Sequence, residues 1–229
     1  MNSILRVAFV VAFLSSSSDE SISRQGKANM NGKWYGLEEG YPIALEMLRS
    51  DDVKEQEIAL KGFASFGRKL REDPVVQEIK VLFLSARSLH VRVGAMQALA
   101  EIGDSRSLAT FRAAMADGNE YVRLFAAYGL LQVDGGSRGD LQLATDVFLR
   151  ILGQERDPKG VDHAVVYCAV ETLDRFARDA GLSQPSPPTD VGSDVRSFID
   201  DVEKWWKSHK TEVIERTMEK RAATVCPRS

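Results

Sequence analysis

Cysteine and histidine are scarce in this chain, and neither is spaced as a metal centre requires. The two cysteines, Cys168 and Cys226, cannot form a disulfide framework. His90, His163 and His209 are isolated from one another, whereas zinc ligands usually come in close pairs such as Cys-x-x-Cys or His-x-x-x-His. We therefore expect no metal site, and no residue pattern indicates a cofactor.

Short catalytic motifs are also missing. The sequence has no glycine-rich phosphate loop and no Gly-x-Ser-x-Gly turn. Cys168 follows His163 by five residues, a spacing that on a helix points the two side chains in different directions, so His163 is badly placed to activate the thiol. We interpret Cys168 as a structural thiol and assign no catalytic residue.

The chain lacks a strong excess of charge and a long hydrophobic run. It has 30 basic and 33 acidic residues and a net charge of −3, so its composition disfavours nucleic acid as a partner. The apolar stretch from Val7 to Leu14 is much shorter than the roughly 20 residues that span a bilayer as a helix. We expect no transmembrane segment in the mature chain.

A regular apolar pattern between residues 91 and 102 predicts an amphipathic helix. Its steps of four, three, one and three put the apolar residues on one side of a helix with about 3.6 residues per turn. Gly103 then supplies a left-handed stop. The stripe is too short to bury itself, so it needs neighbouring helices. Its members are Val91, Ala95, Ala98, Leu99 and Ile102.

The same pattern recurs along the chain, each time after another apolar helical segment. Moving on by 31 residues gives one copy, moving back by 36 gives a second, and moving on by 43 from the first copy gives a third. A repeated pair of helices predicts an all-α fold built from helical hairpins. The copies are Val122, Arg123, Ala126, Gly129, Leu130 and Val133; Ala59, Gly62, Phe63, Phe66 and Gly67; and Val165, Ala169, Thr172, Leu173 and Phe176. The first helices of the hairpins cover residues 43–48, 75–84, 108–115 and 141–152.

These hairpins resemble the HEAT-like repeat family, in the bilin-lyase-like type where Val-Arg opens the second helix and Ile-Gly-Asp closes it. Val91-Arg92 to Ile102-Gly103-Asp104 carries the resemblance best, and Val122-Arg123 to Val133-Asp134 follows it. The first and fourth units depart from it, with Gln56 and Val166 in place of the arginine. The resemblance covers residues 41–181 and implies a short, armadillo-like α-solenoid of about four hairpins.

The remaining segments of the chain predict its domain organisation. Residues 1–18 combine a charged start, an apolar run and four serines, as in a secretory signal peptide of a periplasmic or secreted protein. The alternative is a partner-binding amphiphilic tail in a cytoplasmic protein. Residues 19–40 predict a flexible leader, with Pro42 in the first turn of the first helix. The rest divides into the repeat domain (41–181), a Pro-rich linker (182–193), a C-terminal capping helix (194–222) and a tail (223–229).

In this family the second helix of each hairpin usually lines the concave surface, so the residues off the core stripe should form a groove. The first two rows are polar apart from Val93: Glu57, Lys61 and Ser65, then Val93, Gln97 and Glu101. The later rows add tyrosines, which are good anchors for a protein surface. The alternative is that these tyrosines pack against the Pro-rich linker or the final helix. The predicted partner-binding residues are Leu124, Tyr128, Gln132, Tyr167, Glu171 and Arg175.

Two further features have a structural and a functional interpretation. Arg92 and Arg123, equivalent by the repeat, either bind a carboxylate or phosphate ligand or pair with loop acids and hold the hairpins in register. Trp205 and Trp206 lie about 100° apart on a helix, so only one of them can point squarely into the core. The other either packs at the edge of the domain or forms an exposed contact.

The function that best fits these observations is a non-enzymatic scaffold that binds a protein or peptide on its concave face. Two enzyme families with a similar fold, the bilin lyases and the repeat-type DNA glycosylases, supply the alternative of an enzyme on a HEAT-like scaffold. Export would argue against both, and the acidic balance of the chain argues against the glycosylase. A third alternative is a structural subunit of a larger assembly.

Overall fold

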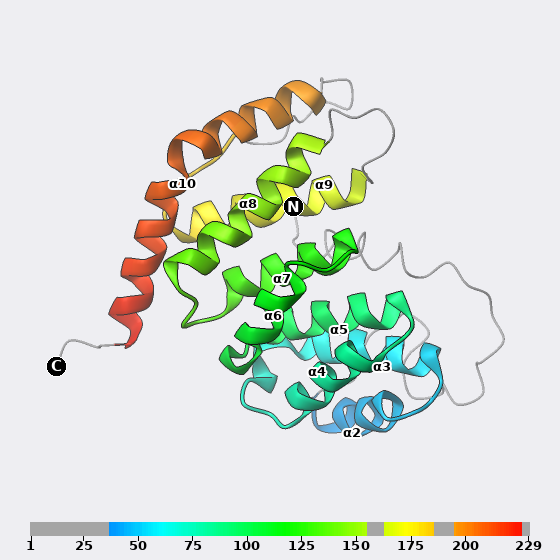
Figure 1. Ribbon diagram of the computed structural model, residues 1–229. Coiled ribbons are helices and arrows are strands. Elements are labelled where there is room, and N and C mark those ends of the chain that lie inside the picture. The colour runs from blue at the N-terminus through cyan, green and yellow to red at the C-terminus, as the bar shows by residue number, and fades with distance from the viewer. Residues whose placement is uncertain (1–36, 155–162, 186–194, 226–229) are drawn as a thin grey trace. The chain divides into compact units, whose positions relative to one another are not determined.

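The computed structural model describes residues 37–154, 163–185 and 195–225 (Figure 1). These residues form nine α-helices, α2 to α10, and two short 3-10 helices, with no strand in the same ranges. The all-α fold class is thereby confirmed. The predicted signal peptide (1–18), leader residues 19–36, linker residues 186–193 and tail residues 226–229 lie outside the described residues.

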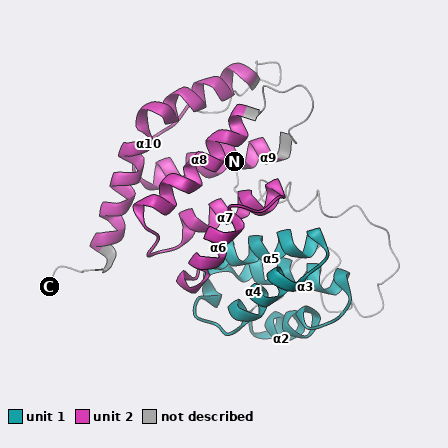
Figure 2. Cartoon of the chain, in the orientation of Figure 1, with its two compact units in different colours: residues 1–102 teal, residues 103–229 magenta. Residues whose placement is uncertain are grey.

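The chain divides into two compact units, residues 1–102 and residues 103–229 (Figure 2). In the first unit α2 packs on α3, α3 packs on α5, and α4 packs on α5. This is the packing of two helical hairpins whose second helices, α3 and α5, lie side by side. The helices are α2 (Leu37–Leu48), α3 (Val53–Phe66), α4 (Val75–Ser85) and α5 (Leu89–Ile102), with a 3-10 turn at Gly67–Leu70.

Local sequence signals set several of these helix boundaries. The Asp52 carboxylate accepts a hydrogen bond from the Lys54 N–H at the start of α3, at 2.8 Å. The Asp73 carboxylate accepts one from the Val75 N–H, also at 2.8 Å, at the start of α4. Gly103 has φ +63° directly after α5, so the predicted left-handed stop is confirmed.

The start of α2 differs from the prediction. The helix begins at Leu37, so residues 37–40 belong to it and Pro42 lies inside it rather than in its first turn. A proline there removes one helical hydrogen bond, and the adjacent residue Tyr41 makes two tertiary contacts. Tyr41 packs edge-on against Phe63, with 5.8 Å between the ring centroids. Its hydroxyl donates to the Asp73 carboxylate at 2.8 Å. Burial and this carboxylate raise the pKa of Tyr41 to about 12.

The second unit consists of two further hairpins and a long final helix. Here α6 packs on α7, α7 packs on α8 and α9, and α10 packs on α8 and α9. The fit between α6 and α7 is tight, because a Cβ on Gly129 would lie 2.4 Å from the buried ring of Phe111. The helices are α6 (Leu108–Ala114), α7 (Glu120–Gln132), α8 (Arg138–Gln154), α9 (His163–Asp179) and α10 (Val195–Val225), with a 3-10 turn at Ser105–Ser107.

The start of α8 is held by a reciprocal cap and an ion pair. The Asp140 carboxylate accepts the Ser137 N–H at 2.7 Å, and the Ser137 hydroxyl accepts the Asp140 N–H at 3.2 Å. Arg112 of α6 donates two hydrogen bonds of 2.7 Å to the same carboxylate. The Arg112 guanidinium is the main reason that the pKa of Asp140 is well below its usual value. These contacts join α6 to α8.

The final helix α10 is bound to the second unit along its length. Trp206 is fully buried, stacks on Phe176 and donates a hydrogen bond of 2.7 Å to the Gln184 side chain. Trp205 is only half-buried and stacks on His209. The prediction that one tryptophan of the pair points into the core is thereby confirmed.

Two basic side chains near the end of α10 donate hydrogen bonds to carbonyls at the C-terminal ends of other helices. Arg221 donates to the carbonyl of Leu131 in α7 at 2.6 Å, and Lys220 donates to the carbonyl of Asp179 in α9. The last carbonyls of a helix lack partners within the helix and carry its negative dipole end, so cations are favourable there. The sequence pattern did not predict these contacts.

Candidate functional site

The tyrosine rows of the second unit come together on α7 and α9. Arg175 of α9 donates a hydrogen bond of 3.2 Å to the hydroxyl of Tyr128 on α7. The Tyr167 hydroxyl donates to the Glu171 carboxylate, also at 3.2 Å, one turn further along α9. Tyr167 is 46% exposed, and Arg175 is exposed as well. Four of the six predicted partner-binding residues thus form two hydrogen-bonded pairs on adjacent helices, which we call the α7–α9 row.

The other two predicted residues differ in exposure. Gln132 is half-buried, whereas Leu124 is only 3% exposed and belongs to the core. Val93, the equivalent of Leu124 in the preceding repeat, is 7% exposed. Both positions are covered because α5 and α7 each pack against several other helices, which buries a wider arc than one stripe. Leu124 is therefore unavailable to a partner.

A small hollow lies between α3 and α5 in the first unit. Its volume is about 10 Å³, and Glu57 and Lys61 on α3 and His90, Gly94 and Gln97 on α5 line it. The predicted rows contain three of these residues, namely Glu57, Lys61 and Gln97. The sequence analysis missed His90, although residues 90, 94 and 97 recur at the spacing of one helix face and so carried the signal. We call this group the Gly94 hollow.

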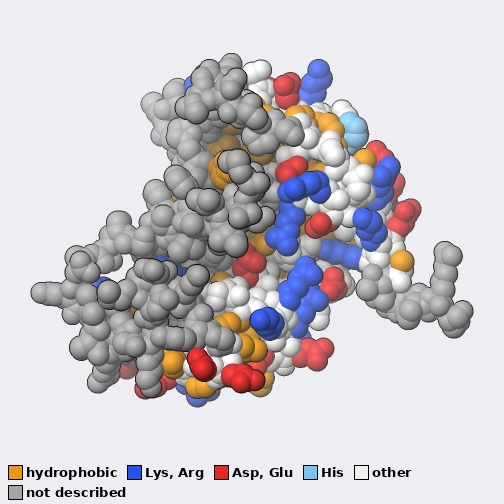
Figure 3. Space-filling model, turned by 180° about the vertical axis from the view of Figure 1, so that it is seen from behind, with side chains coloured by type: hydrophobic (Ala, Val, Ile, Leu, Met, Phe, Trp, Pro, Cys, Tyr) orange, Lys and Arg blue, Asp and Glu red, His pale blue; other side chains and the backbone are white. Residues whose placement is uncertain are grey.

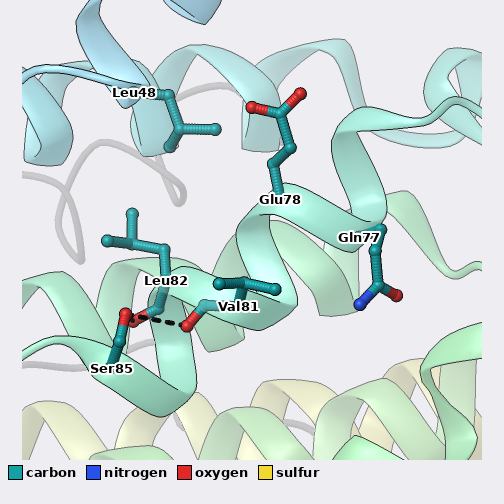
Figure 4. Close-up of a pocket in the computed structure, with 6 residues that line it drawn as sticks. All are labelled: Leu48, Gln77, Glu78, Val81, Leu82 and Ser85. Carbon is teal, nitrogen blue, oxygen red and sulfur yellow. Dashed lines mark hydrogen bonds between the residues drawn. The ribbon is translucent and has the colours of Figure 1, made fainter.

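A second, apolar hollow of about 270 Å³ lies beside α4 (Figure 4). In Figure 4 the side chains of Leu48 and Leu82 face one another across it. Val81, which also lines it, is 55% exposed, and Leu84 on the same helix is 76% exposed. Its remaining lining residues are Gln77, Glu78 and Ser85.

The two repeat arginines make structural contacts. Arg123 donates a hydrogen bond of 2.7 Å to the main-chain carbonyl of Asp117, in the turn before its own helix. Arg92 lies over the ring of Phe83 in the neighbouring helix α4, with 5.5 Å between the guanidinium carbon and the ring centroid. These contacts favour the interpretation that the arginines hold the hairpins in register.

The charged side chains of both signs are mixed on the surface. Figure 3 shows Lys and Arg side chains next to Asp and Glu side chains on the face that it draws. Among the described residues, no three His, Cys, Asp or Glu side chains gather in a group that could hold a metal ion. In the same ranges, no helix is both long enough and apolar enough to cross a membrane.

No protein-family model, no curated protein and no solved structure matches this chain.

Proposed function

We propose that this chain is a short HEAT-like α-solenoid that binds a protein or peptide partner on the surface of its second helices and does not catalyse a reaction. The packing within each unit supports the repeat architecture. In the first unit the second helices α3 and α5 lie side by side, and in the second unit α7 and α9 do so. Each pair of second helices offers a partner a surface of two adjacent helices.

The α7–α9 row is the observation that carries the proposal. Its exposed Tyr167 and Arg175 are of the residue types that contribute most to protein interfaces. The hydrogen bonds to Glu171 and Tyr128 hold both side chains in place before any partner arrives. A side chain that is already ordered loses less conformational entropy on binding, so the row is suited to anchor a partner.

Affinity capture with quantitative mass spectrometry tests the proposal. Full-length wild type and the variants Tyr167→Ala and Arg175→Ala are compared in extracts of the native host. Leu143→Ala, which removes a 43% exposed apolar residue from α8, is the matched control. We expect a partner that wild type and the control retain and that both row variants lose. Equal capture by all four proteins, with unchanged circular dichroism spectra, would refute a binding role for the row.

We also infer export from the composition of residues 1–18. A single basic residue, the apolar run and the serines that follow support a cleaved signal peptide. N-terminal sequencing of the protein from its native host tests this inference. A mature chain that starts near residue 19 would support it, and a chain that retains residues 1–18 would contradict it.

A further inference from the structure

The apolar hollow beside α4, which we call the α4 hollow, leaves hydrophobic surface of the first unit uncovered. Val81 in its lining is 55% exposed, and Leu84 on the same helix is 76% exposed. The volume of the hollow is about 270 Å³. A water molecule takes up about 30 Å³, so the hollow has room for a whole apolar side chain. A hollow with exposed apolar walls is a typical place for another segment to bind.

The chain upstream of the first unit joins α2 within reach of this hollow. The helix begins at Leu37, and Leu48 at its other end lines the hollow. At 1.5 Å per residue these two positions are about 16 Å apart along the helix. Extended chain covers about 3.3 Å per residue, so about five residues span this distance. A tight turn adds about two residues, and the side chain that reaches the Leu48 end therefore lies about seven residues before the helix.

Met30 is the residue at this position of the sequence. It stands seven residues before Leu37, and it is the only apolar side chain larger than alanine between Ile22 and Trp34. A methionine side chain is flexible and fills apolar gaps of irregular shape. Gly36, directly before α2, is the residue type that most readily lets a chain reverse its direction. Trp34 is too near to the helix to reach its far end, because three extended residues span only about 10 Å.

The charges of the upstream segment and of α2 are complementary. Residues 24–33 contain three basic residues and no acidic one: Arg24, Lys27 and Lys33. The helix contains three acidic residues and no basic one, and all three are exposed: Glu38, Glu39 and Glu46. These acids lie in the first and the last turn of α2, so a basic segment that runs back along the helix meets opposite charge at both ends.

From the length of the chain, the charges and the hollow, we propose that residues 24–33 run back along α2 and that the Met30 side chain occupies the α4 hollow. Residues 24–33 lie outside the described part of the chain. The docked methionine covers the exposed side chain of Val81. This contact is on the first helices of the hairpins, so it goes beyond the proposed function, which concerns the surface of the second helices.

Hydrogen exchange of the full-length chain, measured by mass spectrometry, tests the proposal. Wild type is compared with Met30→Asp, which would bring a charge into the hollow. We expect the amides of residues 81–85 to exchange on the order of tenfold faster in this variant, the factor that corresponds to lost burial of one apolar side chain. Ile22→Asp places the same charge on the other apolar residue of the upstream segment and is the matched control. It should exchange as wild type does.

A carbodiimide cross-linker provides a second readout, because it joins an amine directly to a carboxylate that it contacts. We expect links from Lys27 or Lys33 to Glu39 or Glu46 within monomeric protein. Met30→Asp should reduce the yield of these links, whereas the Ile22→Asp control should not.

Three outcomes would overturn the proposal. The first is exchange in residues 81–85 that Met30→Asp leaves unchanged. The second is faster exchange in Val10→Asp but not in Met30→Asp, which would make the apolar run of residues 7–14 the occupant of the hollow. The third is protection that weakens when the protein is diluted, with cross-links found only in dimers, which would make a second copy of the chain the occupant.

Discussion

The Gly94 hollow and the α7–α9 row occupy the same place in the repeat but differ in how their polar groups are used. In the row, Arg175 is bonded to Tyr128 and Tyr167 to Glu171. Around the hollow, within the described residues, Glu57 and Lys61 have no polar partner. The second helices of the two units thus pack in a similar hairpin arrangement, but the polar side chains on their surfaces make different contacts.

The glycines inside the second helices also differ between the two units. Gly129 and Gly94 both lie inside a second helix, yet a Cβ on Gly129 would overlap Phe111, whereas one on Gly94 would make ordinary contacts with Leu60. Replacement by alanine should therefore change the free energy of unfolding in opposite directions at the two positions.

The largest loss of stability is expected for Gly129→Ala. The added methyl group would lie 2.4 Å from the fully buried ring of Phe111, so the ring and α6 must move. Overpacking of this kind costs about 1–3 kcal/mol. Urea denaturation followed by circular dichroism measures the free energy of unfolding. A stability equal to that of wild type would remove the distinction between the two glycines.

The next largest loss of stability is expected for Asp140→Ala, which removes the carboxylate half of the reciprocal cap of α8 and the ion pair with Arg112. Loss of a helix cap alone costs about 0.5–2 kcal/mol. Because the pKa of Asp140 is lowered in the folded state from the ordinary 3.8, its contribution to stability is complete above that value. The contribution is lost as pH falls below it. Denaturation of wild type and variant from neutral pH down to about pH 3 should show the difference shrinking, and a constant difference would contradict the assignment.

A small gain in stability is expected for Gly94→Ala. Replacing a helical glycine by alanine without a clash stabilises a protein by about 0.4–1 kcal/mol. The same urea experiment should therefore give a higher free energy of unfolding than wild type. A loss of stability would show that the first unit needs this glycine for packing.

The smallest effect on stability is expected for Tyr167→Ala. The side chain is 46% exposed, and substitutions at such surface positions usually change stability by no more than about 0.5 kcal/mol. Thermal unfolding should be close to that of wild type even if partner capture is lost. A strong drop in the unfolding temperature would mean that the row is part of the packed structure.

The features that the sequence predicted correctly depend on neighbours along the chain. Helix periodicity located the segments around residues 91 and 122, Gly103 marked a left-handed stop, and the 100° step between Trp205 and Trp206 put only one ring in the core. Each of these inferences needs information from within one helix or its cap.

The features that the sequence did not predict depend on segments far apart in the chain. Pro42 lies inside α2, beside Tyr41, which contacts Phe63 and Asp73 on other segments of the first unit. Leu124 is buried because α7 has neighbours on several sides. No local pattern gives the position of a neighbouring helix, so exposure on the second helices could be predicted only in part.

The basic side chains at the end of α10 have a consequence for how the second unit folds. Arg221 and Lys220 donate hydrogen bonds to the C-terminal ends of α7 and α9, from a position far away in the sequence. Before α10 has docked, only water can satisfy these carbonyls. Docking of α10 is thereby coupled to the ends of both helices.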